Sequence, residues 1–166
     1  MAVVNTKSTT ITNLDAAQVT RAKAFANGAP LKEWIETLEA VNGDSIGSTY
    51  RFFRVPSWLR VSDLLADCDA ITTCAGDVGL YRTAADGGAV VDADFFASAQ
   101  SLAAALVNSN IVHESAVVDA PNYGKRIWEQ LALTTDPQIY YDVVVTLTAA
   151  AASAGTITLR LRGTEV

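Results

Sequence analysis

The strict alternation of apolar and polar residues near the C-terminus is the feature that most constrains the fold. In the sequence TITLRLR, from Thr156 to Arg162, every second residue is apolar: Ile157, Leu159 and Leu161. Successive side chains of a strand point to opposite faces, so this period of two predicts a half-buried antiparallel strand. A second strand is predicted over Gln138 to Thr148, which is rich in tyrosine, valine and threonine.

Three more strand segments lie upstream. Ser48 to Ser57 is β-branched and aromatic until Pro56 ends the run. In Leu59 to Ile71 the apolar positions change parity near Leu64 to Asp67, which predicts a β-bulge in a long strand. Asp77 to Thr83 alternates again and predicts a third strand.

Turn signals separate these segments. Asn42 to Gly47 (NGDSIG) and Ala85 to Ala89 (ADGGA) carry Asn-Gly and Asp-Gly pairs, which supply the positive φ angles of tight reversals. Both segments are therefore predicted to be loops or turns.

One helix is predicted over Asp94 to Val107. Its apolar residues recur at intervals of three and four, as expected for one face of a helix. These positions are Phe95, Phe96, Ala99, Leu102, Ala103 and Leu106. Asp92 or Asp94 would cap its start, and Asn108 to Asn110 would end it. A second, short helix is predicted over Asn122 to Leu131.

The N-terminal region is less regular. Ala2 to Thr12 is rich in valine, threonine and serine and predicts an extended arm. Leu14 to Asn27 can be drawn as a short helix capped by Asn13 or Asp15. Lys32 to Glu39 alternates well enough to be a strand, although a helix is an alternative there.

The strands outnumber the helices, and turns rather than crossover helices separate most of them. This pattern favours a mainly β fold, an antiparallel β-sandwich of which the jelly roll is one form, over a doubly wound α/β sheet. One inserted helix and an extended N-terminal arm complete the prediction. The predicted organisation is an arm and irregular segment over residues 1–47 and a β-sandwich domain over residues 48–166.

Composition narrows the classes of partner. Half of the 166 residues are apolar, which suffices for one domain with a core. The net charge of −6 offers no basic footprint for a phosphate backbone, so nucleic acid is not an expected partner. Leu102 to Val107, the longest weakly polar run, is far shorter than the ~20 residues that cross a bilayer, so no membrane association is expected. The first twelve residues lack the apolar stretch of a signal peptide.

Candidate catalytic and metal-binding groups are few. His113 is the only histidine, and no GxSxG motif accompanies it, so a structural role is favoured over catalysis. Asp86, Asp92 and Asp94 lie near glycines, but their spacing departs from that of an EF-hand loop. A turn and a helix cap are therefore favoured over calcium binding. The sequence predicts no enzyme and no cofactor.

Cysteine and tryptophan are also scarce. Cys68 and Cys74 match no zinc pattern, and two reduced, buried thiols are favoured over a disulfide. Trp34, Trp58 and Trp128 are far apart in the sequence. This spread favours separate core or interface anchors over one sugar-binding platform.

Four ordered blocks of sequence resemble a known family. The blocks are GSTYRFFRVPS, LRVSDLLADCDAIT, AGDVGLYRTAADGGAVVDADFFASAQSLAAAL and YDVVVTLTAAAASAGTITLRLR. Together they resemble small virion proteins of tailed bacteriophages, similar to head decoration or cement proteins. The resemblance covers roughly Val41 to Arg162 and includes no catalytic motif.

The resemblance implies a protein of the phage head, assembled in the host cytoplasm, that binds the outside of the capsid and stabilises it. Its partner would be the major capsid protein, and it would form a homo-oligomer, most simply a trimer. The N-terminal arm is suited to strand addition. The candidate capsid or oligomer contacts are Val3, Val4, Thr9, Thr10, Ile11, Trp34 and Trp58.

Two alternatives stay open. The first is a receptor- or carbohydrate-binding module of a tail fibre, in which Trp58 or Trp34 stacks on sugar. The second is a small hydrolase that uses His113 or the acidic group between Asp86 and Asp94.

Overall fold

The structure, a computed structural model, describes residue 7, residues 9–16, residue 18 and residues 28–165. The chain divides into two compact units, Met1–Pro30 and Leu31–Val166, and each is described by itself. In the first unit, α1 (Thr9–Leu14) is a short helix. The N–H of Asp15 donates to the carbonyl oxygen of Ile11, and its carboxylate accepts a 2.7 Å hydrogen bond from Lys7 Nζ.

This helix corrects part of the predicted arm. Residues 9–12 are helical rather than extended, because threonine disfavours a helix by only a fraction of a kcal/mol and local hydrogen bonding outweighs that preference. Residues 1–6 and 8 lie outside the described residues. So does most of the helix predicted over Leu14 to Asn27.

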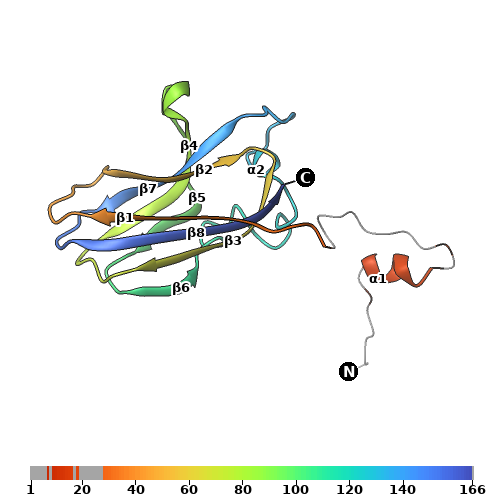
Figure 1. The fold of residues 1–166 in the computed structure, drawn as a ribbon, viewed down its shortest axis with the longest axis horizontal. Helices are drawn as coiled ribbons and strands as arrows, with labels where there is room; N and C mark the ends of the chain where they lie inside the picture. Colours follow the sequence, from red (N-terminus) through yellow and green to blue (C-terminus); the bar gives the residue numbers. More distant parts are fainter. Residues whose placement is uncertain (1–6, 8, 17, 19–27, 166) are drawn as a thin grey trace. The chain divides into compact units, whose positions relative to one another are not determined.

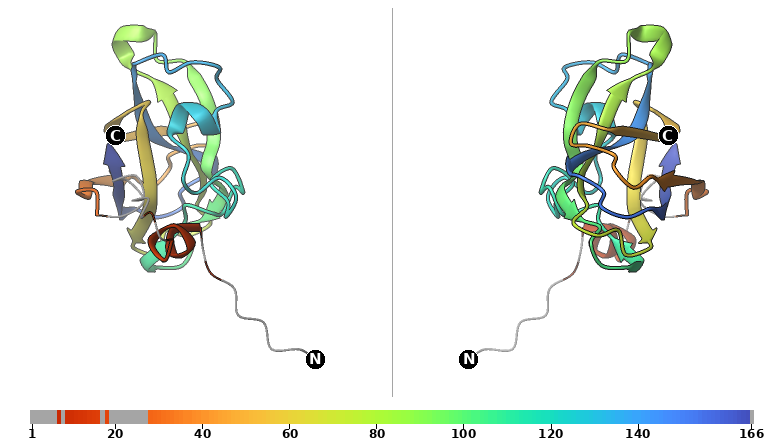
Figure 2. Two further views of the ribbon diagram at one scale, coloured as in Figure 1. Left: turned by 90° about the vertical axis from the view of Figure 1, so that its right-hand side faces the viewer. Right: turned by 90° about the vertical axis from the view of Figure 1, so that its left-hand side faces the viewer.

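The second unit is a β-sandwich (Figure 1). The strands of residues 28–165 are β1 (Lys32–Ala40), β2 (Thr49–Pro56), β3 (Leu59–Cys68), β4 (Ala75–Arg82), β5 (Val90–Ser101), β6 (Leu106–Asn110), β7 (Tyr140–Ala149) and β8 (Gly155–Glu165). They form two antiparallel four-stranded sheets, with the orders β1-β8-β3-β6 and β2-β7-β4-β5. Figure 2 shows the two layers edge-on, with the short helix η2 (Ala84–Asp86, light green) at one end. The predicted antiparallel sandwich is confirmed.

The alternating segment at the C-terminus forms β8, as predicted. It lies between β1 and β3 in the first sheet. Ile157, Leu159 and Leu161 are each at most 1% exposed and face the core. The residues between them face outward, so the sequence period directly determines which side of this strand is buried.

The helix predicted over Asp94–Val107 is wrong, because this segment forms most of β5 and the start of β6. Three register shifts interrupt the pairing of β5 with β4. In the bulged strand, Phe95, Phe96 and Ala97 are buried in succession, and the two phenyl rings meet edge-to-face with centroids 4.8 Å apart. Of the six residues on the predicted helical face, Phe95, Phe96 and Leu102 are buried, whereas Ala99 and Ala103 are exposed, so the apolar spacing of three and four does not mark one buried face.

Gly79 of β4 faces the bulged part of β5. A Cβ atom built on Gly79 would lie 2.2 Å from the carbonyl oxygens of Asp92 and Ala93, a distance that side chains do not tolerate. The close approach of the two backbones explains why this position is glycine.

Gly163 of β8 has the same role beside β3. A Cβ atom there would lie 2.4 Å from the carbonyl oxygen of Arg60, next to the register shift between Val61 and Asp63. The irregularity predicted near residues 64–67 of this strand is present in the pairing with β6, where the register shifts between Ala66 and Cys68, and a second shift lies at Val61/Asp63 in the pairing with β8.

The remaining predicted segments differ from the structure mainly in where they begin and end. The second helix is α2 (Ile127–Gln130), shorter than predicted because residues 121–124 form turns. Lys32 to Glu39 is a strand within β1, which pairs with β8 along its whole length, so this segment belongs to the sandwich unit that begins at Leu31. Cys68 and Cys74 are free thiols in the core, and burial raises the pKa of both.

Candidate functional site

β1 is a long and regular edge strand. Its nine residues pair with β8 without a register shift. No strand of the described residues pairs with its other side. Edge strands with unpaired backbone groups are sites where another chain can add a strand, so this edge is a candidate for partner binding.

Four exposed apolar residues lie on β1 or within six residues of its ends in the sequence. Leu31 precedes β1, Ile35 lies on its outer face, and Val41 and Ile46 lie in the loop that leads to β2. Their side chains are between 57% and 68% exposed. Single exposed apolar residues are ordinary, but four within sixteen residues along one edge form a candidate contact surface. We call these four residues the β1 surface.

The loop that carries Val41 and Ile46 is held in place. Asp44 Oδ2 accepts hydrogen bonds from the N–H of Val41 (2.9 Å) and from the hydroxyl of Tyr50 (2.5 Å). The bond from Tyr50, and secondarily that from Val41, lowers the pKa of Asp44. Burial and the same bond to Asp44 raise the pKa of Tyr50. The loop also bonds to Ala151 through backbone groups, so Val41 and Ile46 are presented on an ordered support.

Polar side chains cover the outer face of the first sheet beside Ile35. Thr37 and Thr158 share a 2.8 Å hydrogen bond between their hydroxyls. Arg162 Nε donates to Glu33 Oε1 at 2.9 Å, which raises the pKa of Arg162. These cross-strand pairs join β1 to β8 and surround the exposed apolar side chain with a polar rim.

The opposite side of the sandwich has a different edge. The N–H of Ser98 in β5 donates to Glu114 Oε2 at 2.5 Å, and the N–H of Ala99 donates to Asp77 Oδ1 at 2.7 Å. Ala99 has a φ of 48°, in the left-handed region. Asp77 lies on β4, which already pairs with β5, so its bond fixes the bulge, whereas Glu114 occupies one N–H of β5. The bulges and this carboxylate make β5 a poor template for a further strand.

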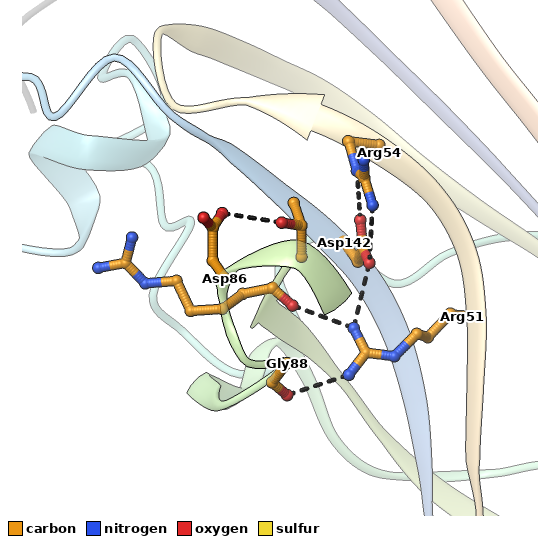
Figure 3. Close-up of polar contacts among 7 residues, drawn as sticks. Arg51, Arg54, Asp86, Gly88 and Asp142 are labelled. Carbon is orange, nitrogen blue, oxygen red and sulfur yellow. Dashed lines mark hydrogen bonds and ion pairs between the residues drawn. The ribbon is translucent and has the colours of Figure 1, made fainter.

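An arginine pair holds the second sheet together (Figure 3). Arg54 Nε and Arg51 Nη1 donate to opposite oxygens of Asp142, at 2.7 and 3.1 Å. Arg51 also donates to the carbonyl oxygens of Arg82 and Gly88, which ties β2 to the β4–β5 hairpin. Asp142 is 7% exposed, so two cations compensate its buried charge.

Sequence reasoning missed this cluster. Arg51 and Arg54 are three residues apart and would face opposite sides of a regular strand. The register shift between Arg51 and Phe53 brings both guanidinium groups to Asp142. The observable signal was the change of parity in the same aromatic run.

The predicted contact residues belong to both units of the chain, and the structure describes only some of them. Val3 and Val4 lie outside the described residues, and Ile11 is an exposed residue of α1 in the first unit. Thr9 and Thr10 begin the same helix. Trp34 lies on β1 and packs against the core. Trp58 lies in the turn between β2 and β3, so these two tryptophans belong to different parts of the sandwich.

The candidate catalytic and metal-binding groups are dispersed. The Nδ1 atom of His113 is bonded to the carbonyl oxygen of Val118. Asp86 accepts from Thr83, whereas Asp92 and Asp94 lie on β5, where burial and then the nearby Asp94 raise the pKa of Asp92. Among the described residues, no three His, Cys, Asp or Glu side chains gather as metal ligands. No helix in that part of the chain is long and apolar enough to span a bilayer.

The comparisons with known proteins give a likeness of fold. No protein-family model and no curated protein match the chain. A chain of the cyanophage Pam1 capsid asymmetric unit is similar, with a TM-score of 0.56 and 13% identity over 100% of both chains. A chain of the capsid of Ralstonia phage GP4 has a TM-score of 0.59 and 16% identity, covering 84% of this chain and 88% of that one. The fold thus resembles that of phage capsid structures.

Proposed function

We propose that the protein is a virion structural protein that binds the outside of a phage capsid and stabilises it as a decoration or cement protein. The observation that carries this proposal is the likeness of fold to chains of two phage capsids, one of which aligns over the full length of this chain. The strand order supports it, because β8 between β1 and β3, and β7 between β2 and β4, is the pairing expected of a jelly roll.

The proposed partner is the major capsid protein, and the β1 surface is the proposed contact. Its apolar residues would be buried against the shell, and the free side of β1 would pair with an extended segment of the partner. This assigns strand addition to β1, since residues 9–12 of the predicted arm are helical. The N-terminal residues Val3, Val4, Thr9, Thr10 and Ile11 remain proposed additional contacts.

The proposed assembly is a homotrimer around local symmetry axes of the shell. A closed oligomer repeats one contact on every subunit and therefore multiplies a modest affinity for the capsid. Light scattering of the purified protein tests this assignment directly. A monomer at micromolar concentration in solution, together with single copies rather than trimers on imaged capsids, would contradict it.

The function is tested by adding the purified protein to capsids prepared without it and imaging the particles. The expected result is additional density on the outer surface of the shell and greater resistance of the particles to heat. Density at the tail, or no binding, would overturn the proposal. A variant that lacks residues 1–12 tests the N-terminal contacts, and unchanged binding and shell stability would exclude them.

A further inference from the structure

A hollow at one end of the sandwich is independent of the β1 surface. It is lined by Trp58, Arg126, Asp136 and Gln138 and has a volume of about 440 Å³. This volume lies within the range of roughly 300–1,000 Å³ that is common for small-molecule sites. Three segments far apart in the sequence meet here: the β2–β3 turn, the residue before α2, and the segment that precedes β7.

The fully buried Ser57 holds these segments together. Its N–H donates to the carbonyl oxygen of Ile139 at 2.8 Å, and its carbonyl oxygen accepts from the N–H of Trp128 at 3.1 Å. Its hydroxyl donates to Asp136 Oδ1 at 2.5 Å. The N–H of Gln138 donates to the same oxygen at 2.9 Å. The hollow is therefore built on a fixed hydrogen-bonded frame rather than on independent loops.

The aromatic wall is also fixed in orientation. The ring of Trp58 meets the ring of Tyr140 edge-on, with centroids 5.4 Å apart and an interplanar angle of 68°. Trp58 is only partly buried, so part of the indole borders the hollow. A ring held in this way loses little conformational entropy when a flat apolar ligand surface stacks on it.

The polar groups of the hollow are of complementary kinds. Arg126 supplies hydrogen-bond donors, and its Nε is buried without a partner among the described residues. Asp136 engages Oδ1 with the protein, and no bond to its Oδ2 is present in the described part of the chain. The amide of Gln138 offers both donors and an acceptor. One cation and one carboxylate balance each other, which disfavours a strongly charged ligand.

We propose that this hollow, formed by Trp58, Arg126, Asp136 and Gln138, binds a neutral saccharide. Sugars present an apolar face of C–H groups, which suits the negative face of an indole, and an edge of hydroxyls that both donate and accept hydrogen bonds. A planar guanidinium, carboxylate and amide around one aromatic ring match both surfaces. A decoration protein with such a site would add weak attachment to surface glycans to its role on the shell.

The test is saturation-transfer NMR on the full-length protein. The probes are a panel of neutral and N-acetylated methyl glycosides and disaccharides at millimolar concentration. We expect saturation transfer to at least one probe, and at least ten-fold weaker binding in Trp58→Ala and Gln138→Ala. Gln138 is exposed and its side chain makes no hydrogen bond within the described residues, so this variant keeps the fold and tests the site even if Trp58→Ala is unstable.

Trp34→Phe is the matched control, because Trp34 lies on β1 and not at the hollow. It should bind the same probe with unchanged affinity. The proposal is overturned if no probe receives saturation, or if Trp34→Phe and Gln138→Ala weaken binding equally. Loss of capsid binding in Gln138→Ala, with no sugar bound by the native protein, would instead assign the hollow to a protein partner. Capsid binding without sugar binding would leave the proposed function intact.

Discussion

The two longest edge strands of the sandwich, β1 and β5, differ in what lies along their unpaired sides. β1 pairs regularly with its neighbour, leaves its other side without a strand of the described residues, and is bordered by exposed apolar side chains. β5 is bulged, and the carboxylates of Glu114 and Asp77 bond two of its backbone N–H groups. Only β1 retains what a strand partner needs, although both strands lie at the edge of a sheet.

This difference indicates how an edge strand that can bind a partner is distinguished from one that is protected against strand addition. A bulge strengthens local twist and removes the regular row of donors and acceptors, so β5 is protected from adding another strand. β1 is regular, and its charged side chains, including Lys32, Glu33, Glu36 and Glu39, are exposed. Charged side chains on an edge strand discourage indiscriminate pairing while leaving the strand accessible to a specific partner.

The largest effect on stability is expected at Gly79 of β4, which faces the bulged edge strand β5. Gly79→Ala should lower the free energy of unfolding by about 3 kcal/mol or more, because its Cβ would meet two backbone carbonyl oxygens that cannot move aside. Chemical denaturation measures the change. Gly124→Ala is the control, since a Cβ there meets no atom within 4 Å, and it should stay within about 0.5 kcal/mol of the native protein. Equal stability of the two variants would show that the bulge does not require Gly79.

The next effect is expected in binding rather than stability. Ile35→Lys should weaken capsid binding at least ten-fold, because it places a charge in the centre of the β1 surface. Val107→Lys introduces the same charge on β6, on a side chain that is 78% exposed, and should bind normally. Both variants should have the same midpoint of thermal unfolding as the native protein. If Val107→Lys impaired capsid binding as much as Ile35→Lys, the assignment of the contact to the β1 edge would be wrong.

A smaller effect is expected when the carboxylate that bonds a backbone N–H of β5 is removed. Glu114→Ala removes the acceptor of the Ser98 N–H and should cost about 1 kcal/mol of stability. Hydrogen exchange at the Ser98 amide should become faster, and self-association at high concentration should increase. Glu36→Ala on β1 is the control, because this carboxylate makes no hydrogen bond in the described part of the chain. It should leave the exchange rate of the Ser98 amide unchanged. Unchanged exchange at Ser98 in Glu114→Ala would indicate that the bulge alone protects this edge.

The smallest effect concerns the loop beside β1. Tyr50→Phe removes the first of the two hydrogen bonds that lower the pKa of Asp44, so the Asp44 titration should move upward towards the ordinary carboxyl value. A lowered folded-state pKa stabilises the fold at pH values above the unfolded pKa, and this stabilisation is lost as the pH falls through the folded pKa. Acid unfolding of Tyr50→Phe should therefore show a smaller dependence on this group. NMR titration of the Asp44 carboxyl carbon measures the shift, and an unchanged midpoint would contradict the role of Tyr50.

Local patterns predicted the strands where the alternation is regular. The segments of β8 and β1 were identified from alternation, and those of β7 and β2 from their β-branched and aromatic residues. β7 is buried at five successive positions and follows no period of two. The pattern failed at β5, where bulges place Phe95, Phe96 and Ala97 in the core in succession. A bulge depends on the neighbouring strand and on Gly79, so a window of local sequence cannot distinguish it from a helical face.

The candidate site was less predictable. Trp34 and Trp58 were identified as possible anchors, but side-chain type alone does not indicate that one packs on the core and the other borders a hollow. The exposed residues Leu31, Ile35, Val41 and Ile46 carry no motif. Their meaning depends on β1 being at the edge of the sheet, and that follows from its pairing with β8, more than a hundred residues away.

The sequence by itself determined a mainly β chain with an apolar core, because the period of two and the turn residues act over a few neighbouring positions. The tertiary structure alone decided which strands lie at the edges, where the bulges fall, and which side chains meet at Asp142 and at Ser57. These outcomes depend on contacts between segments far apart in the chain. Their free energy comes from pairing and packing across the two sheets rather than from the preference of any single residue.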